Sequence, residues 1–151
     1  MIEFQIRENA GMPGLGTVAR RAAAAALAHE GQPDTVEMTV VLTGDQEIQA
    51  LNKQFLGNDA PTDVLSFPSG ETDPESGAVY LGDMIISVER AKLQAMVAGH
   101  SLAAEIELLV VHGVLHLLGY DHGEEGEKRR MWSAQAHILE SIGNPIRDPA
   151  E

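Results

Sequence analysis

The stretch Ser101-Leu-Ala-Ala-Glu-Ile-Glu-Leu-Leu-Val-Val-His-Gly-Val-Leu-His-Leu-Leu118 decides the architecture of this chain. Its apolar residues recur at the spacing of one helical face, and further leucines and valines cover much of the rest of the helix. A helix that is apolar nearly all round is usually buried. We therefore predict a central helix over residues 101–118, with the other elements packed around it.

Two histidines interrupt this apolar helix. Four residues advance a helix by about 400°, so His112 and His116 lie on one face, one turn apart. Gly119 can end the helix in a left-handed conformation, after which the chain turns back and offers His122. A single histidine on such a helix is more often a core residue bonded to a carbonyl. Three of the chain's six histidines within 11 residues instead predict that His112, His116 and His122 bind one divalent metal ion.

The ligand type and number indicate which metal and what use. Three imidazoles suit zinc, and also nickel, copper or iron. Three protein ligands with a fourth position for water are typical of catalytic zinc, which lowers the pKa of its bound water to about 7. We expect one Zn²⁺ per chain, with nickel or another divalent ion as the alternative. Asp121 is the candidate to orient a ring N–H from outside the ligand set. No catalytic residue is assigned beyond the metal site.

A zinc peptidase is the obvious comparison, because its H-E-x-x-H motif places two histidines at the same spacing. Here the position after His112 is Gly113, so the glutamate that acts as general base is missing. Glu105 and Glu107 lie earlier on the helix, and we predict that they face solvent or favour the dipole at its N-terminus. A zinc hydrolase acting on small or peptide substrates is therefore the less favoured alternative.

The rest of the chain predicts an α/β fold of the α+β type, in a single domain over residues 1–151. We expect a mixed sheet of about four strands, packed by about five helices around the central one. Thr43 and Gln46 have the spacing of a capping box at the start of one helix. The expected strands are 1–7, 36–42, 64–67 and 79–88, the last interrupted at Gly82-Asp83; the expected helices besides 101–118 are 17–29, a segment after residue 46, 90–98 and 124–142; 68–77 is expected to be a loop.

Composition excludes several classes of protein. At 151 residues and 44% apolar content the chain is long enough and apolar enough for a buried core. It has no cysteine, which excludes disulfides and thiolate metal sites. No apolar run reaches the length of a membrane span, and the N-terminus lacks the pattern of a signal peptide, so we expect a cytoplasmic protein. The formal net charge of −13 is unusual for a nucleic-acid binder, which usually carries a basic surface.

Three stretches together resemble the YbeY family of bacterial endoribonucleases that mature ribosomal RNA. The run His112-Gly-x-x-His116-Leu-x-Gly-Tyr-Asp-His122 matches the family's signature. Leu51-Asn52, Pro61-Thr-Asp-Val-Leu-Ser-Phe-Pro68 and Leu81-Gly-Asp-Met-Ile-Ile-Ser87 resemble its other motifs in order and spacing. The resemblance extends over residues 36–142 and leaves 143–151 as a short tail.

This resemblance implies a single α/β domain with zinc held by the three histidines. It implies a metal-dependent endoribonuclease, specific for single strands, that acts in 3′-end maturation of 16S rRNA and in late quality control of 70S ribosomes. The implied partners are rRNA and the 30S subunit, with a small-subunit ribosomal protein or an assembly GTPase as further candidates, but no DNA and no membrane. The alternative is a ribosome-assembly factor that acts by binding, with little or no cleavage.

That alternative depends on one departure from the family pattern. The family usually has an arginine after the aromatic residue that follows Leu-Asn-x-x, whereas Phe55 is followed here by Leu56. Leucine cannot replace a planar guanidinium on phosphate, and Lys53 would be only a partial substitute. The other candidate substrate contacts are basic residues near the motifs: Arg90, Lys128, Arg129 and Arg130. Their alternative interpretation is an ordinary solvated helix face. Asp63 and Asp83 are either general bases or, as we favour, caps of backbone turns.

Overall fold

The computed structural model describes residues 3–8, 14–121 and 123–146, with only the backbone described for residues 3–8. Within these residues the chain forms four strands and five helices, which confirms the predicted fold class. The elements are β1 (Glu3–Glu8), α1 (Leu15–His29), β2 (Glu37–Thr43), α2 (Asp45–Leu56), β3 (Val64–Thr72), β4 (Val79–Ser87), α3 (Val88–Ala98), α4 (Leu102–Leu117) and α5 (Glu125–Ser141).

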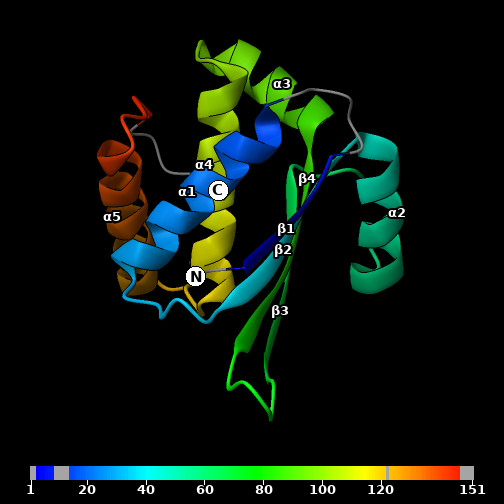
Figure 1. Cartoon of the computed structure of the whole chain (residues 1–151). Coiled ribbons are helices and arrows are strands. Elements are labelled where there is room, and N and C mark those ends of the chain that lie inside the picture. Colours follow the sequence, from blue (N-terminus) through cyan, green and yellow to red (C-terminus); the bar gives the residue numbers. More distant parts are fainter. Residues whose placement is uncertain (1–2, 9–13, 122, 147–151) are drawn as a thin grey trace.

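The sheet is mixed, with the strand order β1-β2-β4-β3. The strand β2 pairs in parallel with both β1 and β4, and β3 pairs antiparallel with β4, which leaves β3 at an edge. Figure 1 shows α2 alone on one side of the sheet, with α1, α4 and α5 on the other. The sheet therefore has one face covered by several helices and one face covered by a single helix.

The predicted central helix is α4, and it is buried along nearly its whole length. Its N-terminus is capped by Ser101, whose hydroxyl accepts a hydrogen bond from the backbone N–H of Ala104 at 3.1 Å. The neighbouring helix α1 packs closely because it presents fully buried alanines: Ala19, Ala22, Ala23 and Ala26. The alanine run thus serves close helix packing as well as helix propensity.

The segment predicted as a loop over residues 68–77 is partly strand, which corrects the prediction. The strand β3 continues through Pro68 to Thr72 and pairs with β4 as a long hairpin. A register shift between Pro68 and Glu71 accommodates the proline. Since β3 is an edge strand, the missing N–H of Pro68 costs no hydrogen bond to a further strand. The hairpin extends beyond the helices in Figure 1.

The strand β4 is also continuous across Gly82-Asp83, where an interruption was expected. Gly82 has a φ of 139°, and a Cβ there would collide with the carbonyl oxygen of Phe67 on the paired strand. Glycine therefore permits the close approach of β3 rather than ending β4.

The predicted capping box at Thr43 is wrong. Thr43 is the buried last residue of β2, paired with Ser87, and Gly44 occupies the N-cap of α2 without a side-chain cap. The backbone N–H of Asp45 instead donates to Oε1 of Glu89 at 2.7 Å. A carboxylate from the first turn of α3 thus caps α2 across space.

None of the helices in the described part of the chain is by itself long and apolar enough to cross a membrane. The pair α3 and α4 passes this test of length and composition when taken together, across a bend of 115°.

Candidate metal centre

The two histidines of α4 converge as their spacing predicts. The Nε2 atoms of His112 and His116 lie 3.1 Å apart, with the ring planes at 78°. Two imidazole nitrogens bound at about 2.0–2.1 Å to one tetrahedral zinc lie roughly 3.3 Å apart. The observed separation therefore fits two ligands of one ion with little adjustment.

The tautomer of His112 is set by a residue from another helix. Nδ1 of His112 lies 3.1 Å from Oε1 of Gln135 on α5, and both residues are almost fully buried. Because an amide oxygen can only accept, the Nδ1–H donates and Nε2 keeps its lone pair for a ligand. Gln135 thus has the place that outer-shell acceptors usually take behind a metal-binding histidine.

The third predicted ligand, His122, lies outside the described residues. Across the rest, no three histidine, aspartate or glutamate side chains come close enough to hold a metal ion. The donor set therefore remains a prediction for its third member. The chemistry and the separation of the two observed imidazoles are those of a metal site.

The histidine pair forms the floor of a groove of about 360 Å³. Its walls come mainly from the edge strand β3, through Val64, Ser66 and Pro68, and from the C-terminus of α2 through Leu56. Leu56 is 62% exposed, so its side chain borders the groove without being needed in the core. The position that departs from the family pattern therefore faces the candidate site.

Asp63 lies in the same groove and has a structural role. Its Oδ1 accepts from the backbone N–H of Val64 at 2.8 Å, and its Oδ2 accepts from Gln94 of α3 at 3.3 Å. Both carboxylate oxygens are thus hydrogen-bonded at the start of β3, and the turn cap expected for Asp63 stays a prediction. Asp83 differs from the prediction because it lies within β4 and accepts the hydroxyl of Tyr80, so it caps no turn.

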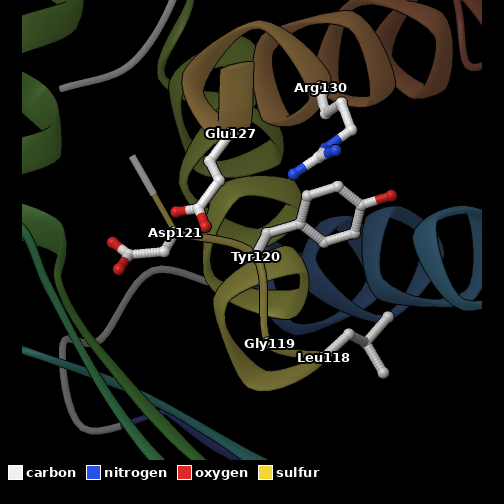
Figure 2. Close-up of a pocket in the computed structure, with 6 residues that line it drawn as sticks. All are labelled: Leu118, Gly119, Tyr120, Asp121, Glu127 and Arg130. Carbon is white, nitrogen blue, oxygen red and sulfur yellow. The ribbon is translucent and has the colours of Figure 1, made fainter. Parts of the chain in front are cut away.

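A second hollow, of about 270 Å³, lies beyond the end of α4 (Figure 2). Tyr120, Asp121, Glu127 and Arg130 are among its lining residues. Asp121, the residue expected to orient a histidine ring N–H, therefore lies here and is exposed to solvent. The hydroxyl of Tyr120 donates to Oε1 of Glu30 at 2.7 Å. This bond to Glu30, together with burial, raises the pKa of Tyr120 above its ordinary value.

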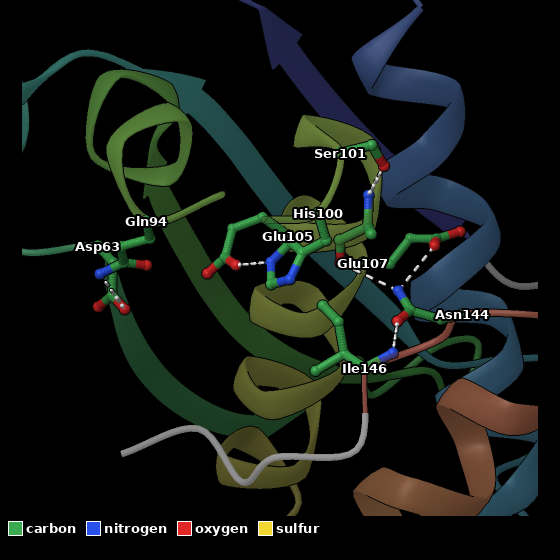
Figure 3. A network of polar contacts seen from close by, with 9 residues as sticks. Asp63, Gln94, His100, Ser101, Glu105, Glu107, Asn144 and Ile146 are labelled. Atoms are coloured by element: carbon green, nitrogen blue, oxygen red, sulfur yellow. Dashed lines mark hydrogen bonds and ion pairs between the residues drawn. The ribbon is translucent and has the colours of Figure 1, made fainter. Parts of the chain in front are cut away.

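Both side chains are buried, so the solvent-facing alternative predicted for Glu105 and Glu107 is wrong. Glu105 does lie in the first turn of α4, as the helix-dipole alternative expects. Glu105 is bonded to His100, and Glu107 accepts from Asn144 at 3.0 Å and from Arg21 at 2.9 Å. Figure 3 shows this network joining the first turns of α4 to the segment after α5. The two carboxylates are thus engaged at the far end of α4 and do not reach the histidine pair.

The predicted substrate contacts are spread over several surfaces. Arg90 pairs with Asp45 at 3.2 Å and ties α3 to α2, while Lys53 lies 3.9 Å from Asp59 on an exposed surface. Lys128 lies 6.0 Å from the centre of the Trp132 ring. No lysine or arginine is among the side chains that line the histidine groove.

Comparison with known proteins identifies the family of this chain. The sequence model of the family Endoribonuclease YbeY matches residues 3–143. The chain belongs to the YbeY family. It is 45% identical over 130 residues to Endoribonuclease YbeY of Geobacillus kaustophilus, covering 82% of this chain and 83% of the relative. It is 44% identical over 151 residues to that of Chloroflexus aurantiacus, covering 95% and 96%.

A solved structure gives the same fold. The solution structure of a protein from Thermotoga maritima superposes with a TM-score of 0.63 at 30% identity, covering 100% of this chain and 99% of that chain. The sequence of this YbeY family member predicts the two histidines and, through the 61–68 motif, the strand beside them. Gln135 was missed, since it lies 23 residues from His112 and carries no spacing signal.

Proposed function

We propose that this chain is a zinc-dependent endoribonuclease, specific for single-stranded RNA, that acts in 3′-end maturation of 16S rRNA and in late 70S ribosome quality control. The zinc ion would be held by His112, His116 and His122, one per chain. The setting would be the cytoplasm, with the 30S subunit as the partner and a small-subunit ribosomal protein or an assembly GTPase as further candidates. Membership of the YbeY family supports the nuclease activity, and the finer terms are the proposal.

The observation that carries the proposal is the convergence of the two Nε2 atoms at the floor of a groove. A structural zinc site is closed by protein ligands, whereas this pair faces a space bounded by an edge strand and a helix end. A chain lying in that groove would pass directly over the two imidazoles. We infer that an extended, unpaired strand occupies the groove, because the groove lies along the edge strand β3.

A bound divalent ion would supply Lewis acidity and positive charge next to the scissile phosphate. The residues of this chain have supporting tasks. Gln135 holds the Nδ1–H of His112, which keeps Nε2 directed at the groove. Asp63 and Gln94 fix the start of β3 and thereby one wall of the groove.

The groove has no lysine or arginine among its lining residues, and this gives the metal ion a second role. A phosphodiester approaching a chain with a net charge of −13 needs a local positive charge. In this groove the metal would be that charge, because Arg90 and Lys53 are engaged elsewhere. We therefore expect RNA affinity, and not only cleavage, to depend on metal occupancy.

The test measures metal content and RNA cleavage on the same purified sample. We expect about one zinc per chain and cleavage of single-stranded rRNA, with both lost in His112→Ala and His116→Ala. His137→Ala is the matched control, since His137 is exposed on α5 and stacks on His29, away from the groove. A wild-type protein that binds no divalent metal would overturn the proposal.

A second function is favoured by Leu56. This leucine borders the groove at the position where the family usually has an arginine, so phosphate loses one charged contact. The alternative is a ribosome-assembly factor that binds rRNA and cleaves it slowly or not at all. Zinc-loaded protein that binds 30S subunits but leaves single-stranded rRNA intact, in both the wild type and Leu56→Arg, would select this alternative.

A peptidase-like function finds no support, because Gly113 and not a glutamate follows His112, and a larger residue there would displace a buried side chain. A Cβ on Gly113 would lie 2.6 Å from Cε and 2.7 Å from Sδ of Met84, which is fully buried on β4. Glycine lets α4 and the sheet approach closely at this position without moving Met84.

A further inference from the structure

A third hollow, of about 560 Å³ and separate from the one beyond the end of α4, lies on the face of the sheet that α2 covers, away from the histidine groove. Its floor is made of two rows of side chains across neighbouring strands. Thr39, Asp83 and Phe67 form one row, and Val41 and Ile85 belong to the next. Its wall is α2. The hollow therefore has one apolar row, Val41 and Ile85, and one row that carries the polar side chains of Thr39 and Asp83.

Two aromatic rings stand at the border of this hollow. Phe55 is 58% exposed, and its ring centroid lies 5.5 Å from that of Phe67 at an angle of 64°. An exposed phenylalanine above an apolar floor leaves one flat side for a planar ligand. Aromatic stacking of this kind is how proteins usually hold an unstacked base of a single strand.

The row that carries Thr39 and Asp83 presents fixed acceptors. Thr39 lies 2.6 Å from the hydroxyl of Tyr80, which donates to Oδ1 of Asp83. Burial and the bond to Asp83 raise the pKa of Tyr80 above its ordinary value, so the phenol keeps its proton. The Asp83 carboxylate is thus oriented from behind, and a carboxylate can only accept hydrogen bonds.

The hollow and the histidine groove share the edge strand β3. Val64, Ser66 and Pro68 line the groove, with Leu65 also at its border, while Phe67 lines the hollow on the opposite face of the strand. The end of α2 repeats this division, with Phe55 at the hollow and Leu56 at the groove. A single strand that crosses the edge of β3 would reach both.

We propose that the hollow formed by Thr39, Val41, Leu51, Phe55, Phe67, Asp83 and Ile85 binds a guanine base of the RNA strand whose backbone lies in the histidine groove. Guanine presents two neighbouring donors, N1–H and the 2-amino group, which match the two oxygens of a carboxylate. Adenine and cytosine place an acceptor nitrogen beside their amino group, and uracil flanks its N3–H with two carbonyls. The hydrogen-bonding edges of adenine, cytosine and uracil would each place an acceptor lone pair against the Asp83 carboxylate, which can only accept.

This inference rests on the proposed function, because it assigns a base position to the same RNA substrate. The chemical competitor is an arginine side chain of a protein, whose guanidinium offers a similar pair of donors. The position of the hollow across one strand from the proposed cleavage groove favours the base.

The test is a titration of the full-length protein with guanosine 5′-monophosphate, followed by methyl NMR signals of Val41, Leu51 and Ile85. The adenosine, cytidine, uridine and inosine monophosphates are the comparators, since each carries the same ribose phosphate. We expect shifts at the three methyl-bearing residues with guanosine monophosphate, and binding weaker by about tenfold or more for inosine monophosphate, which lacks the 2-amino group. Equal binding of all five nucleotides would overturn the proposal.

Two variants with matched controls locate the contacts. Asp83→Asn should remove the preference for guanine, whereas Glu75→Gln, with the same charge change at the exposed turn of the hairpin, should keep it. Phe55→Ala should weaken the binding of all the nucleotides. Leu93→Ala, which removes another exposed apolar side chain, should not. Tighter binding of Nα-acetyl-arginine amide than of guanosine monophosphate in the same titration would assign the hollow to a protein side chain and overturn the proposal.

Failure of this inference is distinguishable from failure of the proposed function. Guanine-selective binding without any RNA cleavage would retain the base site and reject the nuclease. Cleavage of RNA with no response of the three methyl-bearing residues would reject the base site and retain the nuclease.

Discussion

Oε1 of Gln135 accepts the Nδ1–H of His112 across 3.1 Å, and both residues are almost fully buried. This contact joins α5 to α4 at the point where α4 carries the histidine pair. It makes the direction of the His112 lone pair a property of two helices rather than one. In the proposed metal site, Gln135 would therefore contribute to binding without touching the metal.

Replacing Gln135 by leucine should lower zinc affinity by about 10- to 100-fold, because His112 loses the acceptor that fixes its tautomer. Gln135→Glu keeps an acceptor and should bind zinc at least as tightly as the wild type. Competition with a chromophoric chelator measures the affinity, and chemical denaturation shows whether the fold persists. Gln54→Leu on the exposed side of α2 is the control. Unchanged zinc affinity in folded Gln135→Leu would contradict the assignment.

The central helix and the histidine spacing could be predicted because both are local. The periodicity of residues 101–118 specifies burial, and Ser101 specifies where α4 begins. The groove-facing pair follows from four residues of helix geometry. Nothing beyond the sequence of α4 was needed for these features.

The features that were missed depend on partners far away in the sequence. Glu107 is buried because Arg21, 86 positions earlier, and Asn144, 37 positions later, satisfy its carboxylate. The cap of α2 comes from Glu89, 44 positions after Asp45, so a local capping rule chose the wrong residue. Proline and glycine in 68–77 indicated a loop, but an edge strand with a register shift accommodates both.

Gly113→Ala should destabilise the protein by about 1–3 kcal/mol, because the added methyl would overlap the buried Met84 side chain. Urea denaturation measures the loss. Met84→Ala opens space at the same place, so the double variant should be more stable than the sum of the two single losses predicts. Gly126→Ala is the matched control, since a Cβ at that position of α5 meets no atom within 4 Å. Strict additivity of the two losses would argue against the contact.

Leu56→Arg should strengthen binding of single-stranded RNA and raise cleavage, because it places a guanidinium on the wall of the histidine groove. One new phosphate contact should steepen the slope of log affinity against log salt by about 0.7. Binding across a salt series provides the measurement. Leu93→Arg makes the same charge change on the exposed face of α3 and should have a smaller effect. Equal gains in both variants would indicate a general charge effect and not a contact in the groove.

Folding stability should fall as the pH rises above about 10, and Tyr80 should account for part of the loss. Burial, followed by the hydrogen bond to Asp83, raises the pKa of Tyr80 above its ordinary value of 10.0 in the folded state. The folded protein then holds a proton that the unfolded chain releases first, so the stabilisation is complete below pH 10 and declines above it. Urea denaturation at several pH values should show a shallower alkaline decline for Tyr80→Phe. The chain has two tyrosines, so absorbance titration of this variant reports Tyr120 alone. An alkaline decline as steep in Tyr80→Phe as in the wild type would show that the Tyr80–Asp83 bond does not couple to folding.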